Sequence, residues 1–306
     1  MSKIELRLSN VDPPDPEPKR TIYRDIVNLP DPVKLGLTIR YFNHDDVDLY
    51  FQITGSGTGY TFGTVNLGLL ATGANAYINL DEFASRAKPS AGDLPNGEKE
   101  ENITLTLKAY TDSGYSTLKW TYERIVTVYW INSADAAFTV DFLNNFDDGT
   151  VQGWAVANES NNQAGYPTLG VITDYVLSTP YSLRMIQRRA DGISIPNEIR
   201  ARLYKSFTTP NKDKVFAIID LRTALDSGNW NKYLKVQRDD TVLIQLGRPY
   251  DTVAEHYFPA AKWMRIVIPL PKNTTLEIRV AHDYLQNTVN VNYAYMWLDD
   301  FKIISK

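Results

Sequence analysis

The 306-residue sequence has no cysteine. Disulfides, thiolate-bound zinc and thiol catalysis are therefore excluded. Histidine is also scarce: the three residues, His44, His256 and His282, are far apart and lack the paired spacing of a zinc site. His44 precedes Asp45 and His282 precedes Asp283 in turn-like segments. We therefore expect the histidines to be solvated loop residues rather than ligands.

Long apolar runs and a basic excess are absent too. No stretch approaches the ~18 apolar residues of a membrane helix, and residues 1–8 lack the apolar segment of a signal peptide. The chain carries 32 Lys and Arg against 36 Asp and Glu, a net charge of −4, whereas a nucleic-acid-binding protein usually has a basic face. We expect a soluble chain with no membrane insertion and no nucleic-acid partner.

Recognisable catalytic motifs are missing. The sequence contains neither a G-x-S-x-G nucleophile elbow nor a G-x-x-x-x-G-K-[ST] phosphate loop. Any chain with 36 acidic residues offers carboxylate pairs, so their presence alone does not indicate a glycoside hydrolase. We predict that the protein is not an enzyme.

Helical periodicity is weak, and most segments alternate polar and apolar residues with the period of a β-strand. In the first half this pattern predicts strands at 4–8, 33–41, 47–53, 60–70, 76–80, 103–110 and 122–131. Residues 80–87 are expected to form one or two helical turns, and 87–102 a loop. Four prolines within 12–18 block helix and ladder hydrogen bonds and predict an extended, acidic arm.

The second half shows the same alternation after a boundary near 132–135. Strands are predicted at 138–142, 181–187, 201–207, 215–220, 233–237, 241–246, 263–268, 276–280 and 294–304. The predicted fold is all-β, with two β-sandwich domains at 1–135 and 136–306. In pattern, the first resembles immunoglobulin-like or fibronectin-III-like adhesion domains.

The second half resembles the jelly-roll carbohydrate-binding modules in four motifs that stand in the family's order. They are NFDDGT at 145–150 with Gly153-Trp154, STPYSLR at 178–184, KWMRIVIPL at 262–270, and MWLDDFKI at 296–303. Together they indicate a jelly roll and say little about the ligand. Trp154 and Trp263 fall on core positions of the family. Trp297, in the closing strand, is expected in the core or between domains.

The resemblance implies a structural calcium ion, because such modules often hold one where their first and last strands lie side by side. Calcium takes about six to eight oxygen ligands. Asp147 and one of Asp299 and Asp300 would supply carboxylates, with backbone carbonyls completing the shell. The family commonly has Glu where this chain has the shorter Asp147. The alternative is a simple turn at Asp147 and an Asp pair that binds an arginine.

Carbohydrate recognition would use exposed aromatic rings, on which sugar rings stack. Trp230 is the first candidate, because the segment 226–233 is polar, contains glycine and predicts a loop. The residues expected to join it are Tyr233, Arg248, Tyr250 and Tyr257. The alternative is that Trp230 folds back onto the sandwich as a plug.

A group of basic residues lies on two neighbouring predicted strands. It comprises Arg184, Arg188, Arg189, Arg200, Arg202 and Lys205. A stripe on one face of a sheet would receive an acidic glycan or a partner protein. We favour the alternative, a solvated outer face.

The sequence leaves three functions open. The first is a non-catalytic binding or adhesion protein that recognises a glycan or polysaccharide through its jelly roll. The second is a structural or assembly protein of a virion, tail or surface filament, including a receptor-binding one, whose partners are copies of itself or other structural proteins. The third, least favoured, is a glycoside-processing enzyme. The module type favours an extracellular or virion-surface location.

Overall fold

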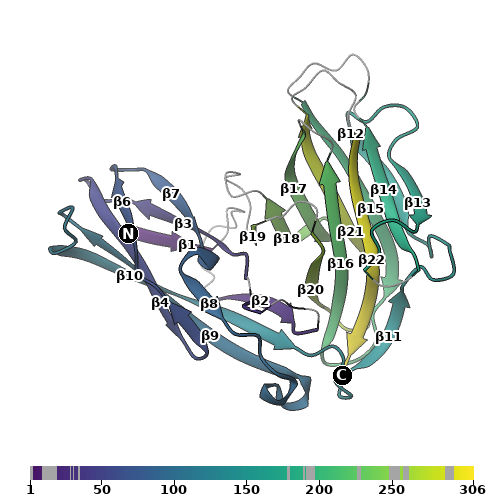
Figure 1. The fold of residues 1–306 in the computed structure, drawn as a ribbon, viewed down its shortest axis with the longest axis horizontal. Coiled ribbons are helices and arrows are strands. Elements are labelled where there is room, and N and C mark those ends of the chain that lie inside the picture. Colours follow the sequence, from purple (N-terminus) through teal and green to yellow (C-terminus); the bar gives the residue numbers. More distant parts are fainter. Residues whose placement is uncertain are drawn as a thin grey trace. The chain divides into compact units, whose positions relative to one another are not determined.

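The computed structural model describes residues 3–8, 19–27, 29, 31–33, 35–177, 180–188, 190, 197–225, 229–247, 256–257, 262–286 and 293–306. At 19–20, 197–198, 225, 229–233, 244–247, 256–257 and 284–286 only the backbone is described. The chain divides into two compact units, residues 1–132 with 249–257 and residues 133–248 with 258–306 (Figure 1). Its described elements are almost all β-strands, which confirms the all-β prediction. None of the described helices has the length and apolarity to cross a membrane.

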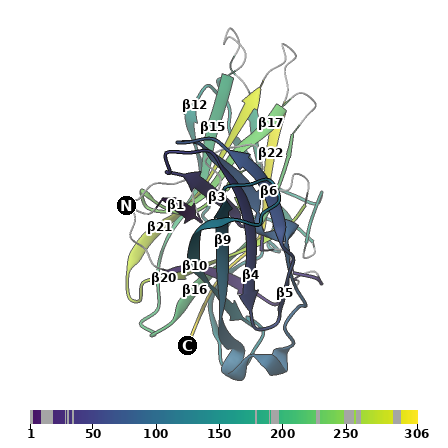
Figure 2. The same ribbon diagram turned by 90° about the vertical axis from the view of Figure 1, so that its left-hand side faces the viewer.

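Two main sheets form the first unit. The smaller has the order β1-β3-β7 (Ile4–Arg7, Thr38–Asn43, Asn75–Asn79). The larger has the order β2-β10-β9-β4-β6 (Lys19–Asp25, Leu118–Ile131, Glu98–Tyr110, Leu49–Gly57, Val65–Leu70), and Figure 2 shows β9 beside β4. Inward-facing residues of both sheets, among them Leu6, Phe51 and Val128, pack in one core. The immunoglobulin-like assignment of this unit stays a prediction.

Several details of the first unit differ from the predicted pattern. The strand predicted at 60–70 is two strands, because the Gly63 amide donates to the Phe83 carbonyl (2.7 Å) and turns the chain between them. β5 (Tyr60–Phe62) pairs with β8 (Ala84–Arg86), whereas β6 pairs with β4. Three short 3-10 helices, η1, η2 and η3, follow at Leu80–Glu82, Ala91–Asp93 and Pro95–Gly97.

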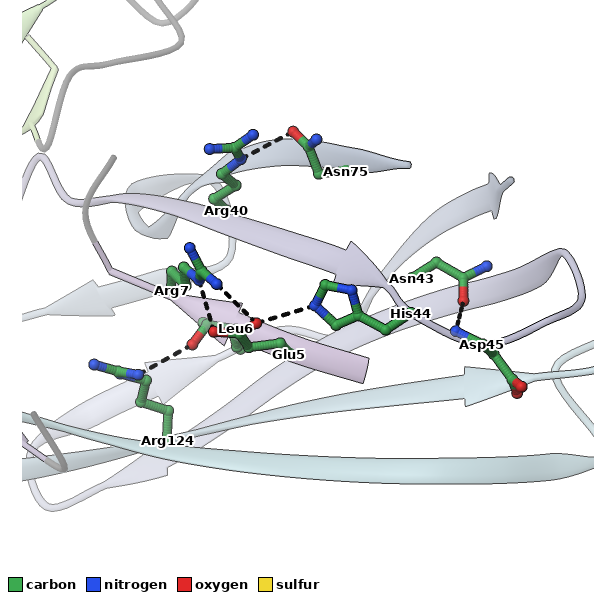
Figure 3. Close-up of polar contacts among 9 residues, drawn as sticks. All are labelled: Glu5, Leu6, Arg7, Arg40, Asn43, His44, Asp45, Asn75 and Arg124. Carbon is green, nitrogen blue, oxygen red and sulfur yellow. Dashed lines mark hydrogen bonds and ion pairs between the residues drawn. The ribbon is translucent and has the colours of Figure 1, made fainter. Parts of the chain in front are cut away.

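Polar contacts hold β1 against its own neighbours (Figure 3). Arg7 Nε donates to Glu5 Oε1 at 2.6 Å, and Glu5 Oε2 lies 3.0 Å from His44 Nε2. The Arg124 guanidinium donates to the Leu6 carbonyl at 3.4 Å. β1 also pairs antiparallel with β3. The strand predicted at 4–8 is therefore part of its own sandwich, at one edge of the sheet β1-β3-β7.

Two facing sheets also form the second unit. One has the order β13-β14-β22-β16-β20 (Thr168–Ile172, Ser182–Arg188, Tyr293–Ser305, Val215–Leu225, Met264–Leu270), and β11 (Thr139–Asn144) pairs with β22 as well. The other has the order β12-β15-β21-β17-β18 (Ala155–Ser160, Asn197–Thr208, Thr275–Gln286, Asn229–Arg238, Thr241–Gly247). β19 is the two-residue strand His256–Tyr257. The core between the sheets contains Phe146, Trp154 and Phe301.

The last strand, β22, lies in the middle of its sheet (Figure 1). β16 pairs with it along one edge, and β14 and β11 share the other edge through residues 293–298 and 301–305. The expectation that the first and last strands of the jelly roll lie side by side is confirmed. Trp154 is in the core as predicted, with its ring centroid 5.2 Å from that of Phe301. Trp263 is only half-buried.

Candidate functional site

In the sheet β12-β15-β21-β17-β18, successive side chains of a strand alternate between the core and the outer face. Leu203 on β15, Val280 on β21 and Val236 on β17 point into the core. Their sequence neighbours point to the opposite side, because successive strand residues alternate between faces. This places charged side chains together: Arg200 and Arg202 of β15, Arg279 and Asp283 of β21, and Lys235 of β17.

These side chains surround a hollow of roughly 170 Å³. Its lining is mostly polar and comprises Glu159, Arg200, Arg202, Lys235, Gln237, Asp240, Arg279, Ala281 and Asp283. Strand register brings them together: Arg202 is opposite Ala281, which is opposite Lys235. We call this site the charged hollow.

Asp283 lies at the centre of the ion pairs in the charged hollow. Its carboxylate is almost fully buried and lies 3.7 Å from Arg200 Nε and 3.4 Å from Lys235 Nζ. One carboxylate is thus shared between two cations. Because a charge this deeply buried is stable only when paired, Asp283 fixes the positions of both basic groups.

Arg202 and Arg279 line the hollow on either side of Ala281. Arg202 Nη1 lies 3.4 Å from Glu159 Oε1, while its Nε is buried without a hydrogen-bond acceptor among the described residues. Arg279 pairs with Asp240 and donates to Glu277, and the hydrogen bond to Glu277 raises the pKa of Arg279. The hollow therefore offers fixed donors next to fixed carboxylate acceptors.

Such an arrangement suits a ligand with neighbouring hydroxyl groups. Each hydroxyl both donates and accepts, a guanidinium only donates, and an ionised carboxylate only accepts. A pair such as Arg202 and Glu159 can therefore bind two adjacent hydroxyls at once. Hydrogen bonds to charged groups are also shorter and stronger than those between neutral groups.

Of the five predicted ligand-binding residues, the structure describes the backbone of three. Trp230 and Tyr233 lie in β17, so the predicted loop at 226–233 is wrong from residue 229 onward. Tyr233 pairs with Asp283 of the charged hollow. Tyr257 lies in β19. The side chains of these three residues, and all of Arg248 and Tyr250, lie outside the described residues, and their binding role stays a prediction.

The predicted calcium ligands lie near the paired strands β11 and β22. Asp147 is exposed and accepts a hydrogen bond from Asn145 Nδ2 at 2.5 Å, while Asp299 is buried and accepts one from the Leu177 amide. Burial, with Asp299 and Asp220 adding to it, raises the pKa of Asp300. Within the described part of the chain, no three His, Asp or Glu side chains cluster as a metal site. The calcium ion stays a prediction.

The predicted basic stripe is wrong, because its members belong to different sheets. Arg184 and Arg188 are on β14, next to β22, whereas Arg200, Arg202 and Lys205 are on β15 in the facing sheet. Arg189 lies outside the described residues. Consecutive strands of this sandwich alternate between sheets here, so closeness in sequence does not place two residues on one surface.

The histidines also depart from prediction. His282 is not in a turn but fully buried on β21, where its Nδ1 lies 3.0 Å from Gln187 Nε2. Burial lowers the pKa of His282 to about 3. His44 is 37% exposed and bonded to Glu5. The side chain of His256 lies outside the described residues.

The residues of the charged hollow were largely missed by motif reasoning. Lys235, Gln237, Arg279 and Asp283 belong to no family motif. The available signal was the alternation of apolar residues with polar or charged ones, Lys235 and Gln237 in β17 and Arg279 and Asp283 in β21, which marks the face opposite the core.

No protein-family model and no curated protein matches the sequence. Solved structures show a likeness in fold. One, from carbohydrate-binding modules of the beta-sandwich superfamily, is 12% identical over 89% of this chain and 93% of its own, with a TM-score of 0.38. The N-terminal tandem modules of Xyn10C from Paenibacillus barcinonensis are 9% identical over 88% and 86%, with a TM-score of 0.35.

An adhesin domain is among the similar structures as well. The K1 domain of Lys-gingipain from Porphyromonas gingivalis W83 is 12% identical over 54% of this chain and 98% of its own, with a TM-score of 0.36. The chain thus resembles β-sandwich carbohydrate-binding modules and adhesin domains. These likenesses concern the fold alone and name no ligand for this chain.

Proposed function

We propose that the protein is a non-catalytic carbohydrate-binding protein and that the charged hollow of its second unit binds the sugar. One observation carries this proposal: the hollow sets the unmatched Arg202 Nε donor beside two fixed ion pairs, Arg202–Glu159 and Lys235–Asp283. A ligand rich in hydroxyl groups supplies both the acceptor and the donors that this arrangement can use. The hollow is open to a polysaccharide chain because it lies on a sheet face.

Affinity electrophoresis in a panel of neutral and acidic polysaccharides tests the proposal. We expect at least one polysaccharide to retard the wild-type protein. Arg202→Ala should weaken that interaction by about tenfold or more, because a hydrogen bond from a charged group contributes roughly 1.5–3 kcal/mol. The matched control is Lys272→Ala, which removes an exposed cation of the same unit that pairs with Asp213.

Circular dichroism first shows that each variant is folded, and the retardation of the folded variants is then compared. Loss of retardation in Arg202→Ala but not in Lys272→Ala supports the charged hollow. Equal binding by wild type and Arg202→Ala would remove the hollow as the site. Trp230→Ala in the same gels tests the predicted aromatic platform. No retardation by any polysaccharide would contradict the proposed function.

A further inference from the structure

A row of aromatic rings lies on the other sheet of the second unit, on the face turned away from the core. Met296 and Leu298 of β22 are core residues, so Tyr293, Tyr295 and Trp297 face outward. Ring centroids are 6.2 Å apart for Tyr293 and Tyr295 and 5.6 Å apart for Tyr295 and Trp297. The three rings thus form a continuous row along the strand.

Two further rings extend this row. The Tyr166 ring lies 6.1 Å from Tyr293, and the Tyr175 ring lies 5.2 Å from Trp297. Tyr175 is 56% exposed, whereas Trp297 beneath it is 3% exposed. Five aromatic rings on one surface, four of them at least partly exposed, exceed what a solvated sheet face requires.

Arginines stand beside this row on both neighbouring strands. Arg184 of β14 and Arg222 of β16 are the two cross-strand partners of Trp297, and Arg188 of β14 is the partner of Tyr293. The Arg222 guanidinium lies 4.3 Å from the Tyr175 ring centre, and that of Arg188 lies 5.9 Å from the Tyr293 ring centre. Figure 1 shows β22 with β14 and β16 at its sides.

None of these three arginines has a carboxylate partner among the described residues, in contrast to the cations of the charged hollow. Two acidic side chains of β16 and β22 are engaged elsewhere. Asp220 binds Arg265 through both carboxylate oxygens, at 2.8 and 2.5 Å, and Asp299 accepts a hydrogen bond from the Leu177 amide. Among the described residues, the guanidinium groups of Arg184, Arg188 and Arg222 are therefore without an ion-pair partner, although the whole chain has a net charge of −4.

Three buried donors on this face also have no acceptor in the described structure. They are the Nε atoms of Arg188 and Arg222 and the Nε1 atom of Trp297. Buried polar groups in native proteins are nearly always hydrogen-bonded, so unmatched groups call for an explanation. All three are donors, and therefore the molecule that completes them must supply acceptors.

We propose that this arginine–aromatic face, formed by Tyr293, Tyr295, Trp297, Arg184, Arg188 and Arg222, is a second binding site whose ligand is an acidic polysaccharide. Uronate carboxylates pair with the guanidinium groups in bidentate geometry, and sugar rings contact Tyr175, Tyr293 and Tyr295, which are at least partly exposed. The site is separate from the charged hollow, which lies on the facing sheet, and it differs in chemistry because its cations have no carboxylate partner among the described residues.

Polygalacturonate and its methyl ester are the probes, since they share one sugar backbone and differ in charge. Binding is measured by titration calorimetry with wild type, Arg184→Gln, Arg184→Gln/Arg222→Gln, and the matched control Lys272→Gln, an exposed cation of the same unit. Arg202→Gln reports separately on the charged hollow. We expect wild type to bind the acid at least tenfold more tightly than the ester. The double variant should lose at least tenfold in affinity for the acid, Arg184→Gln should lose part of it, and Lys272→Gln should keep it. Added salt should weaken the interaction.

Each other outcome overturns the proposal. Equal affinity for the acid and the ester would show that charge plays no part. Loss in Arg202→Gln with retention in the double variant would place the acid in the charged hollow, which leaves the proposed function intact. Stronger competition by an oligodeoxythymidylate than by oligogalacturonate would make this a nucleic-acid site. Should the double variant be misfolded by circular dichroism, unchanged affinity in Arg184→Gln is the overturning result.

Discussion

Buried polar residues give the second unit a specific dependence on pH. His282 is fully buried between the sheets, bonded to Gln187, and its pKa is lowered to about 3 because burial disfavours the imidazolium. An unfolded histidine has a pKa of about 6.5. Between these two values the unfolded chain binds a proton that the folded unit does not.

The stability of the second unit should therefore decrease as the pH falls below about 6.5, by about 1.4 kcal/mol per pH unit from this residue alone. His282→Asn keeps an acceptor for Gln187 but cannot titrate. Thermal unfolding of both proteins at pH 7.5, 6.0 and 5.0 measures the difference. We expect the variant to start less stable, because it is smaller, and to lose less on acidification. Parallel losses would contradict the assignment.

The formation of strand β2 depends on its pairing with β10 rather than on a strong alternation of polar and apolar residues in its own sequence. It pairs in parallel with β10, from Lys19 opposite Ile125 to Asp25 opposite Ile131. Ile22 is buried in the first core, while Thr21 is exposed. Adjacent residues of one short strand therefore have opposite environments.

We expect Ile22→Asp to destabilise the first unit by about 3 kcal/mol or more, because it places an unpaired carboxylate in the core. Thr21→Asp, one residue earlier, should change stability by less than about 0.5 kcal/mol. Urea unfolding followed by tyrosine and tryptophan fluorescence compares them. Similar midpoints for the two variants would contradict the placement of β2.

The strands that the sequence predicted are those in which polar and apolar residues alternate strongly. β9 and β22 contain the segments predicted at 103–110 and 294–304, because their inward residues are large and apolar at every second position. Strands β2, β12 and β13 lack this contrast between large apolar inward residues and polar outward residues, and the sequence did not predict them.

The charged hollow and the arginine–aromatic face depend on which strands share a sheet. This is a property of the whole topology, which local periodicity does not contain. Trp297 is an example: its buried, outward position follows from the loop bearing Tyr175.

At the scale of the whole molecule, the described residues of each unit form a large hydrophobic core of their own. Phe51 belongs to the first and Phe301 to the second, and both side chains are fully buried. A core that is complete within each unit predicts two unfolding transitions rather than one.

Calorimetry of Phe51→Ala and Phe301→Ala tests this independence. Each substitution should cost about 3–5 kcal/mol through the cavity it leaves. Phe51→Ala should lower the temperature of one transition and Phe301→Ala that of the other. A single transition that shifts equally in both variants would show that the cores unfold together.

The central place of β22 also bears on how the protein is made. A ribosome delivers the chain from its N-terminal end, and domains fold as units when their residues have emerged. All the strands of the first unit's two main sheets precede residue 132, so that sandwich can form early. The strands β11, β14 and β16 must wait for β22, since it is the partner of all three. The second sandwich therefore stays open, with its apolar faces exposed to chaperones, until residue 305 has been translated.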